Sequence, residues 1–177
     1  FFAKTLDKVR PGGVVAFITS KGTMDKENSY VRKYLSQRAD LIGAIRLPND
    51  TFKKSAGTTV TSDILFLQKR ESITDIEPSW VNLGYNEDGI KINNYFVEHP
   101  EMVLGKMEMV SGRFGPESAC IPLEEESLED LLESAVSNIH AEIKEYELDD
   151  IGEEEDLSIE ADFGVKNFSY TIVDDIT

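Results

Sequence analysis

Hydrophobic and polar positions follow clear helix and strand periods over the first 70 residues of the chain. Phe2, Leu6 and Val9 fall at helical spacing, and Pro11-Gly12-Gly13 ends that helix because proline cannot continue it and glycine accepts the turn geometry. Residues 14–19 (VVAFIT) form a continuous β-branched and aromatic run. Such a run predicts a central sheet strand that is buried on both faces.

A second helix and two more strands follow. Tyr30, Val31, Tyr34 and Leu35 predict one apolar helix face ending near residue 38, and residues 41–47 predict a strand. Strand, helix and strand in this order predict a right-handed crossover with a parallel pair. Residues 48–61 form a polar loop, and the strand at 62–69 (SDILFLQK) has no helix before it, so it should pair antiparallel. The sequence thus predicts an α/β, doubly wound sheet whose edge is finished by an antiparallel hairpin.

The pattern weakens after residue 71 and predicts an acidic α+β extension. Short strands are predicted at 80–83 and 90–92, and a helical turn at 95–99 that Pro100 stops. An apolar stripe predicts an acidic helix at about 125–147. We therefore divide the chain into an α/β segment at 1–71, a small α+β extension at 72–147, and an acidic linker with a terminal strand at 148–177.

Charge separates the same segments. Residues 1–71 hold 13 Lys and Arg against 7 Asp and Glu, whereas residues 72–177 hold 5 against 27. The first segment is therefore a candidate for contact with a polyanion such as DNA, and the acidic remainder would be repelled by phosphates. Solvated faces that serve only solubility are the alternative explanation of both charge sets.

Composition excludes several classes of protein. The chain has 177 residues, of which 40% are hydrophobic, and no apolar run is long enough to cross a membrane. A single cysteine, Cys120, permits no internal disulfide, which favours a reducing, cytoplasmic setting. We expect Cys120 to be a small buried side chain, His99 with Glu98 and Glu101 to form a surface turn, and no metal to bind. The chain opens Phe1-Phe2 without a methionine, and we expect it to be a fragment of a longer protein.

Three stretches carry a resemblance to a known family. They read LDKVRPGGVVAFITSKG, LIGAIRLPNDTF and AGTTVTSDILFLQKR, and together cover about 65 residues. This ordered set resembles the C-terminal half of the catalytic domain of S-adenosylmethionine-dependent adenine-N6 DNA methyltransferases, as in restriction-modification or phage and plasmid methylase-helicase proteins. The resemblance implies a Rossmann-like sheet that closes with an antiparallel hairpin, and an activity that methylates the exocyclic amine of adenine. Cytosine N4 stays open as the target.

The chain departs from this family in two motifs. Neither the cofactor-binding D-P-x-x-G-x-G pattern nor the catalytic N-P-P-Y motif occurs in the sequence. The resemblance thus implies S-adenosylmethionine as the cofactor of the parent protein, none bound by this fragment alone, and no catalysis without the missing N-terminal half. A helicase or restriction domain is a further possible part of that parent.

The resemblance also indicates one site residue. Phe52, in N-D-T-F-K-K, corresponds to an aromatic residue that stacks on the extruded base, and its alternative role is a plain apolar contact at the sheet edge. Lys21, Lys53, Lys54 and Thr58 are candidate DNA contacts, with solvated side chains as the alternative.

Two rival functions need no catalysis. The 27 acidic residues after position 71 also fit a protein-interaction or DNA-mimicking antirestriction module. A methyltransferase-like subunit that only recognises DNA is the third possibility.

Overall fold

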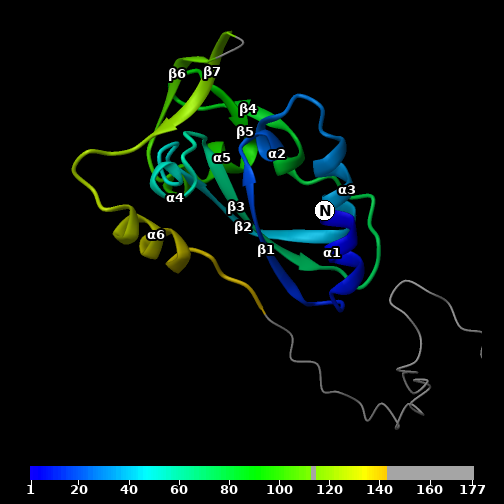
Figure 1. The fold of residues 1–177 in the computed structure, drawn as a ribbon. Helices are drawn as coiled ribbons and strands as arrows, with labels where there is room; N and C mark the ends of the chain where they lie inside the picture. The colour runs from blue at the N-terminus through cyan, green and yellow to red at the C-terminus, as the bar shows by residue number, and fades with distance from the viewer. Residues whose placement is uncertain (113–114, 143–177) are drawn as a thin grey trace, which may run out of the picture. The chain divides into compact units, whose positions relative to one another are not determined.

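A three-stranded antiparallel sheet organises the first half of the chain in the computed structural model, which describes residues 1–112 and 115–142 (Figure 1). Its strands lie in the order β1-β3-β2, and β3 runs antiparallel to both neighbours. Two separate hairpins follow, β4 with β5 and β6 with β7. The described part of the chain is therefore a mixed α and β structure with small antiparallel sheets.

The helices and strands have the following bounds. In chain order they are α1 (Phe2–Lys8), β1 (Val14–Ser20), α2 (Gly22–Asp25), α3 (Tyr30–Arg38), β2 (Ala39–Leu47), α4 (Lys53–Ala56), β3 (Ser62–Lys69), β4 (Leu83–Tyr85), β5 (Lys91–Asn93), α5 (Asn94–Glu98), β6 (Lys106–Gly112), β7 (Gly115–Ile121) and α6 (Leu128–Ser137), with 3-10 turns at Ser79–Val81 and Pro100–Met102.

The position of β1 differs from the prediction. β1 is an edge strand in which every second residue is exposed, whereas β3 occupies the centre and has no exposed residue, half of its residues being buried and half partly buried. β1 and β2 do run parallel, but β3 lies between them, so they form no parallel pair. The predicted antiparallel pairing of the last two strands is confirmed.

Helices cover the two faces of the sheet. On one face, Leu6 of α1 and Leu35 of α3 pack with Leu67 of β3, Trp80 and Val81. The predicted face of α3 is wrong in part, because Arg32, Leu35 and Ser36 are its buried residues, whereas Tyr30 and Val31 are exposed. In Figure 1, α1 and α3 lie on one side of the sheet and α6 on the other.

One hydrophobic cluster joins residues from both sides of position 71. It includes Ile45 of β2 and Leu65 of β3 together with Phe96 of α5, Cys120 of β7 and Ala135 of α6. The described residues all belong to a compact unit that spans Phe1–Lys144. The three-segment division of the sequence stays a prediction, but the segment after residue 71 shares its core with the sheet.

The acidic helix is shorter than predicted. α6 begins after Ser127, whose side chain accepts a hydrogen bond from the backbone of Glu129, and ends at Ser137. Asn138 follows as the C-cap, and Ile139 turns back to lie against Gly43 of β2. Residues 143–147 of the predicted helix, and the predicted linker and terminal strand at 148–177, lie outside the described residues.

Strands β6 and β7 were not predicted. Their seven residue pairs form an antiparallel hairpin from Lys106 to Ile121. Both strands are short of β-branched residues, so their sequence carries little strand signal. No helix among the described residues is long and apolar enough to cross a membrane.

Candidate nucleic-acid interface

The loop at residues 48–61 carries four of the five predicted site residues. It connects the end of β2 with the start of β3 and contains the short helix α4. The backbone of Phe52 accepts a hydrogen bond from Ala56, and that of Lys53 accepts one from Gly57, which ends the turn with a φ of 64°. A left-handed residue at this position favours glycine, so Gly57 lets the chain leave α4 without strain.

One residue of β7, Cys120, holds the two ends of this loop. The backbone N–H of Asn49 donates to the carbonyl oxygen of Cys120 at 2.8 Å, and the N–H of Cys120 donates to Oγ1 of Thr61 at 2.9 Å. Within the loop, the N–H of Val60 donates to the carbonyl of Asn49 at 2.7 Å. The loop is therefore closed at its base, and α4 projects from that base.

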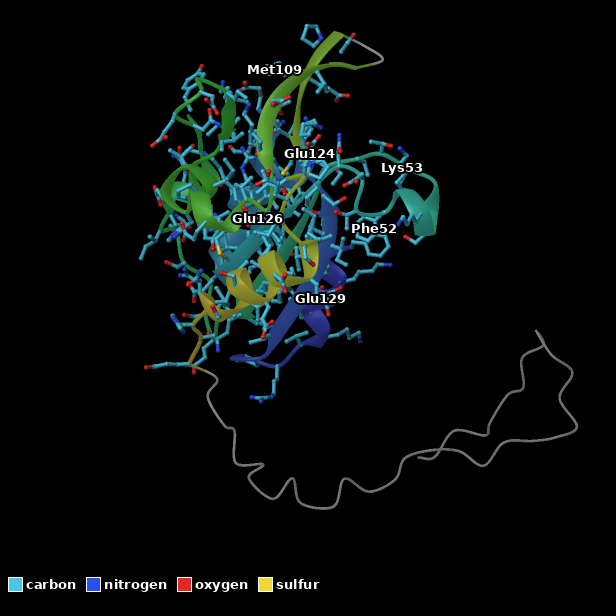
Figure 2. All side chains as sticks on the ribbon, turned by 90° about the vertical axis from the view of Figure 1, so that its left-hand side faces the viewer. Phe52, Lys53, Met109, Glu124, Glu126 and Glu129 are labelled. Carbon is cyan, nitrogen blue, oxygen red and sulfur yellow. The ribbon has the colours of Figure 1, made fainter. Side chains whose placement is uncertain are left out.

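Phe52 lies at the start of α4 beside Lys53 (Figure 2). Its ring is half-buried and packs partly against the main hydrophobic cluster. Lys53, Lys54 and Thr58 are exposed. The structure thus brings an aromatic ring and two exposed cationic side chains together at one short helix.

Lys21 occupies a different environment. It follows β1, and its ammonium donates hydrogen bonds to the carbonyl oxygen of Ser118 and, at 3.0 Å, to the Ser118 hydroxyl in β7. Its side chain is only half-exposed. The ammonium is thus engaged inside the molecule, and a phosphate contact by Lys21 stays a prediction.

A buried ionic network lies beneath the loop. Arg46 of β2 and Asp63 of β3 are fully buried, and Nε and Nη2 of Arg46 donate to Oδ1 and Oδ2 of Asp63 at 2.8 and 2.9 Å. Nη1 of Arg46 pairs with Oδ2 of Asp25 at 2.8 Å, and the guanidinium lies 4.3 Å from the centre of the Phe96 ring. Burial alone lowers the pKa of Arg46, but the contacts with Asp63 and Asp25 outweigh it and raise the pKa, so the guanidinium stays charged.

This network links three chain segments at the end of the sheet where β1 and β2 finish and β3 begins. Asp25 follows β1, Arg46 precedes the loop at the end of β2, and Asp63 follows the loop at the start of β3. Oδ1 of Asp25 also accepts the backbone N–H of Asn93, a buried residue whose side chain donates to the carbonyls of Met24 and Trp80. This network was not predicted from the sequence. Its signal was a charged residue inside each of two apolar strands, and the two charges are paired in register.

The remaining candidates show ordinary environments. Cys120 is buried as predicted, and burial raises the pKa of its thiol to about 12. His99 is exposed and lies 3.3 Å from Glu101. Within residues 1–112 and 115–142, no three His, Cys, Asp or Glu side chains gather in a way that fits a metal ion.

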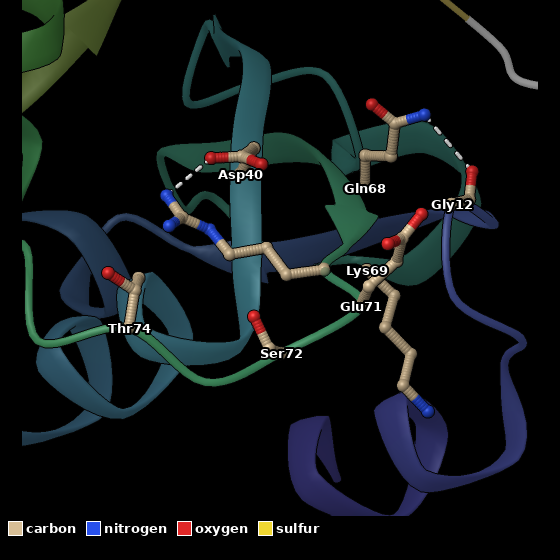
Figure 3. A pocket seen from close by; sticks show the side chains of 8 residues that line it. Gly12, Asp40, Gln68, Lys69, Glu71, Ser72 and Thr74 are labelled. Carbon is tan, nitrogen blue, oxygen red and sulfur yellow. Dashed lines mark hydrogen bonds and ion pairs between the residues drawn. The ribbon is translucent and has the colours of Figure 1, made fainter.

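A surface hollow lies at the other end of the strands (Figure 3). It has a volume of about 450 Å³ and is lined at its base by Asp40, Gln68 and Arg70. Arg70 pairs with Asp40 at 2.5 Å, and Nε2 of Gln68 donates to the Gly12 carbonyl at 3.0 Å. Nε of Arg70 is buried without a hydrogen-bond partner, and the hollow contains none of the predicted site residues.

Comparison with known proteins gives one partial relative. The chain is 34% identical over 70 residues to "Defense against restriction protein B" of Escherichia phage P1, a match that covers 39% of this chain and 3% of that protein. No protein-family model matches the chain. No solved structure matches it either. The chain is therefore similar, over a limited stretch, to a small part of a much longer phage protein.

Proposed function

We propose that this chain is part of a DNA methyltransferase that transfers a methyl group from S-adenosylmethionine to the exocyclic amine of adenine. The observation that carries the proposal is the position of the loop at 48–61. It holds Phe52, Lys53 and Lys54 at the end of the sheet where the C-terminal ends of β1 and β2 lie. Ligands of doubly wound sheets bind at the carboxyl ends of the parallel strands. The resemblance implies a Rossmann-like sheet that closes with an antiparallel hairpin, and the antiparallel pairing of β2 with β3 supports that part of the proposal.

In this proposal the loop receives a base that has left the duplex. Extruding a base costs a few kcal/mol, and stacking on an aromatic side chain returns about 1–3 kcal/mol per base. Phe52 is half-buried, so its ring is fixed by the core and keeps an open face for stacking. Lys53 and Lys54 are exposed next to it and would contact the phosphates on either side of the base, and Thr58 would add a hydrogen bond.

The methyl donor would bind outside the described residues. At the carboxyl end of β1, Lys21 is turned to Ser118 and Asp25 to Arg46, so these polar groups offer no cradle for S-adenosylmethionine. The cofactor and the catalytic Asn would belong to another part of the parent protein, which would work on DNA in the cytoplasm. A helicase or restriction domain in that parent stays a prediction.

The test uses the longer gene product that contains this chain. Methyl transfer to duplex DNA is followed with labelled S-adenosylmethionine, and the modified base is identified as N6-methyladenine or N4-methylcytosine by mass spectrometry. Phe52→Ala should lower the rate at least about tenfold, while Phe52→Tyr keeps most of it, because stacking needs a ring. Unchanged transfer by Phe52→Ala would remove the stacking role, and absence of any transfer by the parent would remove the methyltransferase.

A second candidate function is an acidic interaction or DNA-mimicking antirestriction module. Its support is a run of exposed carboxylates on and before α6, together with the printed name of the phage relative. These residues are Glu124, Glu125, Glu126, Glu129, Asp130 and Glu133, of which Figure 2 labels three. Methylating DNA and imitating its charge are both physical ways to resist a restriction enzyme, so the name does not separate the two functions.

The two functions differ in their binding partner. A DNA mimic should bind a basic restriction endonuclease and lose that binding steeply between 50 and 300 mM salt. Changing Glu124, Glu126 and Glu129 to Gln should weaken the binding, and changing Glu27, Glu71 and Glu87 to Gln provides a control with the same change in net charge. No salt-sensitive binding by the unchanged chain would rule out the mimic.

A further inference from the structure

A second hollow lies where the β4–β5 hairpin, α5 and the start of β6 meet. It has a volume of about 530 Å³, within the range of roughly 300–1,000 Å³ that is typical of ligand sites. Its base is apolar and joins the main hydrophobic cluster through Ile92, Phe96 and Met107, which are at most 5% exposed. The base is therefore held in place by core packing.

Hydrogen bonds around Asn86 hold the turn at the mouth of this hollow. The backbone N–H of Asn86 donates to the carbonyl of Ile90 at 3.0 Å, and the Asn86 side-chain oxygen accepts the N–H of Ile90 at 2.7 Å. The N–H of Gly89 donates to the Asn86 carbonyl, and its φ of 72° favours glycine. The turn therefore presents Glu87 and Asp88, both exposed, in one arrangement at the mouth.

The mouth of the hollow is negatively charged. Nζ of Lys106, the one ammonium among the lining residues, pairs with Oε1 of Glu108 at 2.9 Å. The pKa of Lys106 is raised, first by the hydrogen bond with Glu108 and further by the charge of Asp88. No cation of the described residues lies within ion-pair distance of Glu87 or Asp88. Two carboxylates are thus left to attract a positive charge.

An exposed aromatic ring stands beside these carboxylates. Tyr85, at the end of β4, lines the hollow and is 62% exposed, and such a ring attracts a cation to its face. The polar side chains among the described lining residues belong only to positions 85–88 and to Lys106, all near the mouth. The base thus offers none of the convergent polar groups that orient a small molecule. An apolar base with a charged rim is typical of a protein contact, in which one large side chain is the anchor.

We propose that this hollow receives a short segment of a separate, basic partner protein. One aromatic or large aliphatic side chain of that segment lies on the apolar base, and a neighbouring Lys or Arg contacts Glu87, Asp88 and the ring of Tyr85. The unpaired carboxylates select a cationic partner and repel DNA. This inference goes beyond the proposed function and does not depend on it, because no residue of the loop at 48–61 lines the hollow.

Peptide binding to the isotopically labelled 177-residue chain tests the proposal. The probe is the peptide acetyl-Gly-Lys-Trp-Lys-Gly-amide at 50 mM salt, and binding is followed by NMR shifts. Shifts should concentrate at residues 85–88, 92, 96–97 and 103–107, with a Kd of about 1 mM or lower. Replacing the peptide's Trp by Ser should weaken binding at least about tenfold, because the apolar contact is lost. Replacing both of its lysines by Glu should abolish binding through charge repulsion.

Matched variants of the chain separate the hollow from general charge. Tyr85→Ser with Asp88→Asn should weaken binding of the Lys-Trp-Lys peptide at least about fivefold. Tyr30→Ser with Asp75→Asn makes the same two changes at exposed positions that do not line the hollow, and should leave the Kd unchanged. Lys106→Gln removes the competing ammonium and should tighten binding about two- to fivefold. All five positions are exposed, and thermal unfolding checks that each variant folds.

Three outcomes would overturn the proposal. The first is the absence of shifts around the hollow at about 5 mM peptide, well above the expected Kd. The second is equal binding of the Trp and Ser peptides, which would leave only charge attraction at the surface. The third is a doubled mass of the chain alone in light scattering that Tyr85→Ser with Asp88→Asn restores to a single mass, which would assign the hollow to a second copy of this chain.

Discussion

Arg46 and Asp63 face each other in register across β2 and β3, both fully buried, and are joined by two hydrogen bonds of 2.8 and 2.9 Å. The guanidinium is planar and matches the two carboxylate oxygens, so the pair fixes the relative position of the two strands. Because the loop at 48–61 connects these strands, the pair also fixes the two ends of the loop.

Removing one partner of the buried pair should destabilise the protein strongly. Asp63→Ala leaves a charged guanidinium in the interior beside Asp25 alone, and we expect a loss of about 3–5 kcal/mol in the free energy of unfolding. Lys91→Ala removes the exposed, solvent-screened pair with Glu27 and should change the free energy of unfolding far less than Asp63→Ala does. Urea unfolding measures both. The double variant Arg46→Met with Asp63→Leu should lose less than Asp63→Ala, and an equal loss would contradict a charge-burial cause.

Stability should fall at alkaline pH because of Cys120. Its thiol has a pKa of about 12 in the folded protein, raised by burial, against about 8.5 in an unfolded chain. The neutral thiol is thus favoured by the fold, and its contribution is complete below pH 8.5 and is lost as the pH rises toward 12. Relative to Cys120→Ala, the wild-type chain should lose about 2 kcal/mol between pH 7.5 and 10. Urea unfolding at several pH values tests this, and parallel pH curves for the two proteins would refute it.

A larger side chain at position 43 should destabilise the protein while Ile139 is present. A Cβ atom at position 43 would lie 3.0 Å from Cγ1 of Ile139, closer than ordinary packing allows. Gly43→Val should therefore cost about 1–3 kcal/mol through overpacking. Ile139→Ala in the same chain should return part of that loss, which a double-mutant cycle measured by thermal unfolding will reveal. Strict additivity would show that the two residues are not in contact.

Lys53 and Lys54 should contribute to DNA binding through charge alone. If each neutralises one phosphate, the double change to Ala lowers the slope of log K against log salt by about 2 and weakens binding equally for all duplex sequences. Fluorescence anisotropy with labelled duplexes at 50–200 mM salt gives the slope. Lys4→Ala with Lys8→Ala, both exposed on α1, is the matched control and should leave the slope unchanged.

The sequence predicted the bounds of a helix or strand correctly where the local side-chain pattern is compatible with only one of the two. The predicted strand at 62–69 has the bounds that the structure shows, because polar residues precede and follow it. The predicted helix end near residue 38 is also where α3 stops, although β2 begins there directly at Ala39. The position of β1 was not predictable, since VVAFIT and ILFL are equally apolar. Which strand lies centrally is decided by the pairing of β3 with both neighbours, and this pairing leaves no local mark in either sequence.

The site was predictable only in its exposed part. Phe52, Lys53 and Lys54 stand out in a polar loop, and the structure places them on one short helix. Arg46 and Asp63 were passed over because a lone charge in an apolar strand has no visible partner until the strands are placed in register. The engagement of Lys21 with Ser118 joins residues 97 positions apart, which no local pattern reveals.

The attachment of Cys120 to Asn49 and Thr61 has a consequence for how this protein can be divided. The loop belongs to residues 48–61, yet its closing hydrogen bonds come from a strand more than 50 residues later. A polypeptide that stops after β3 would retain every predicted DNA-contact residue and lose the backbone groups that hold the loop shut. Recombination between related proteins at a point between β3 and β7 would therefore transfer the loop without the strand that holds its ends together. Only an exchange that transfers both the loop and β7 would keep these hydrogen bonds.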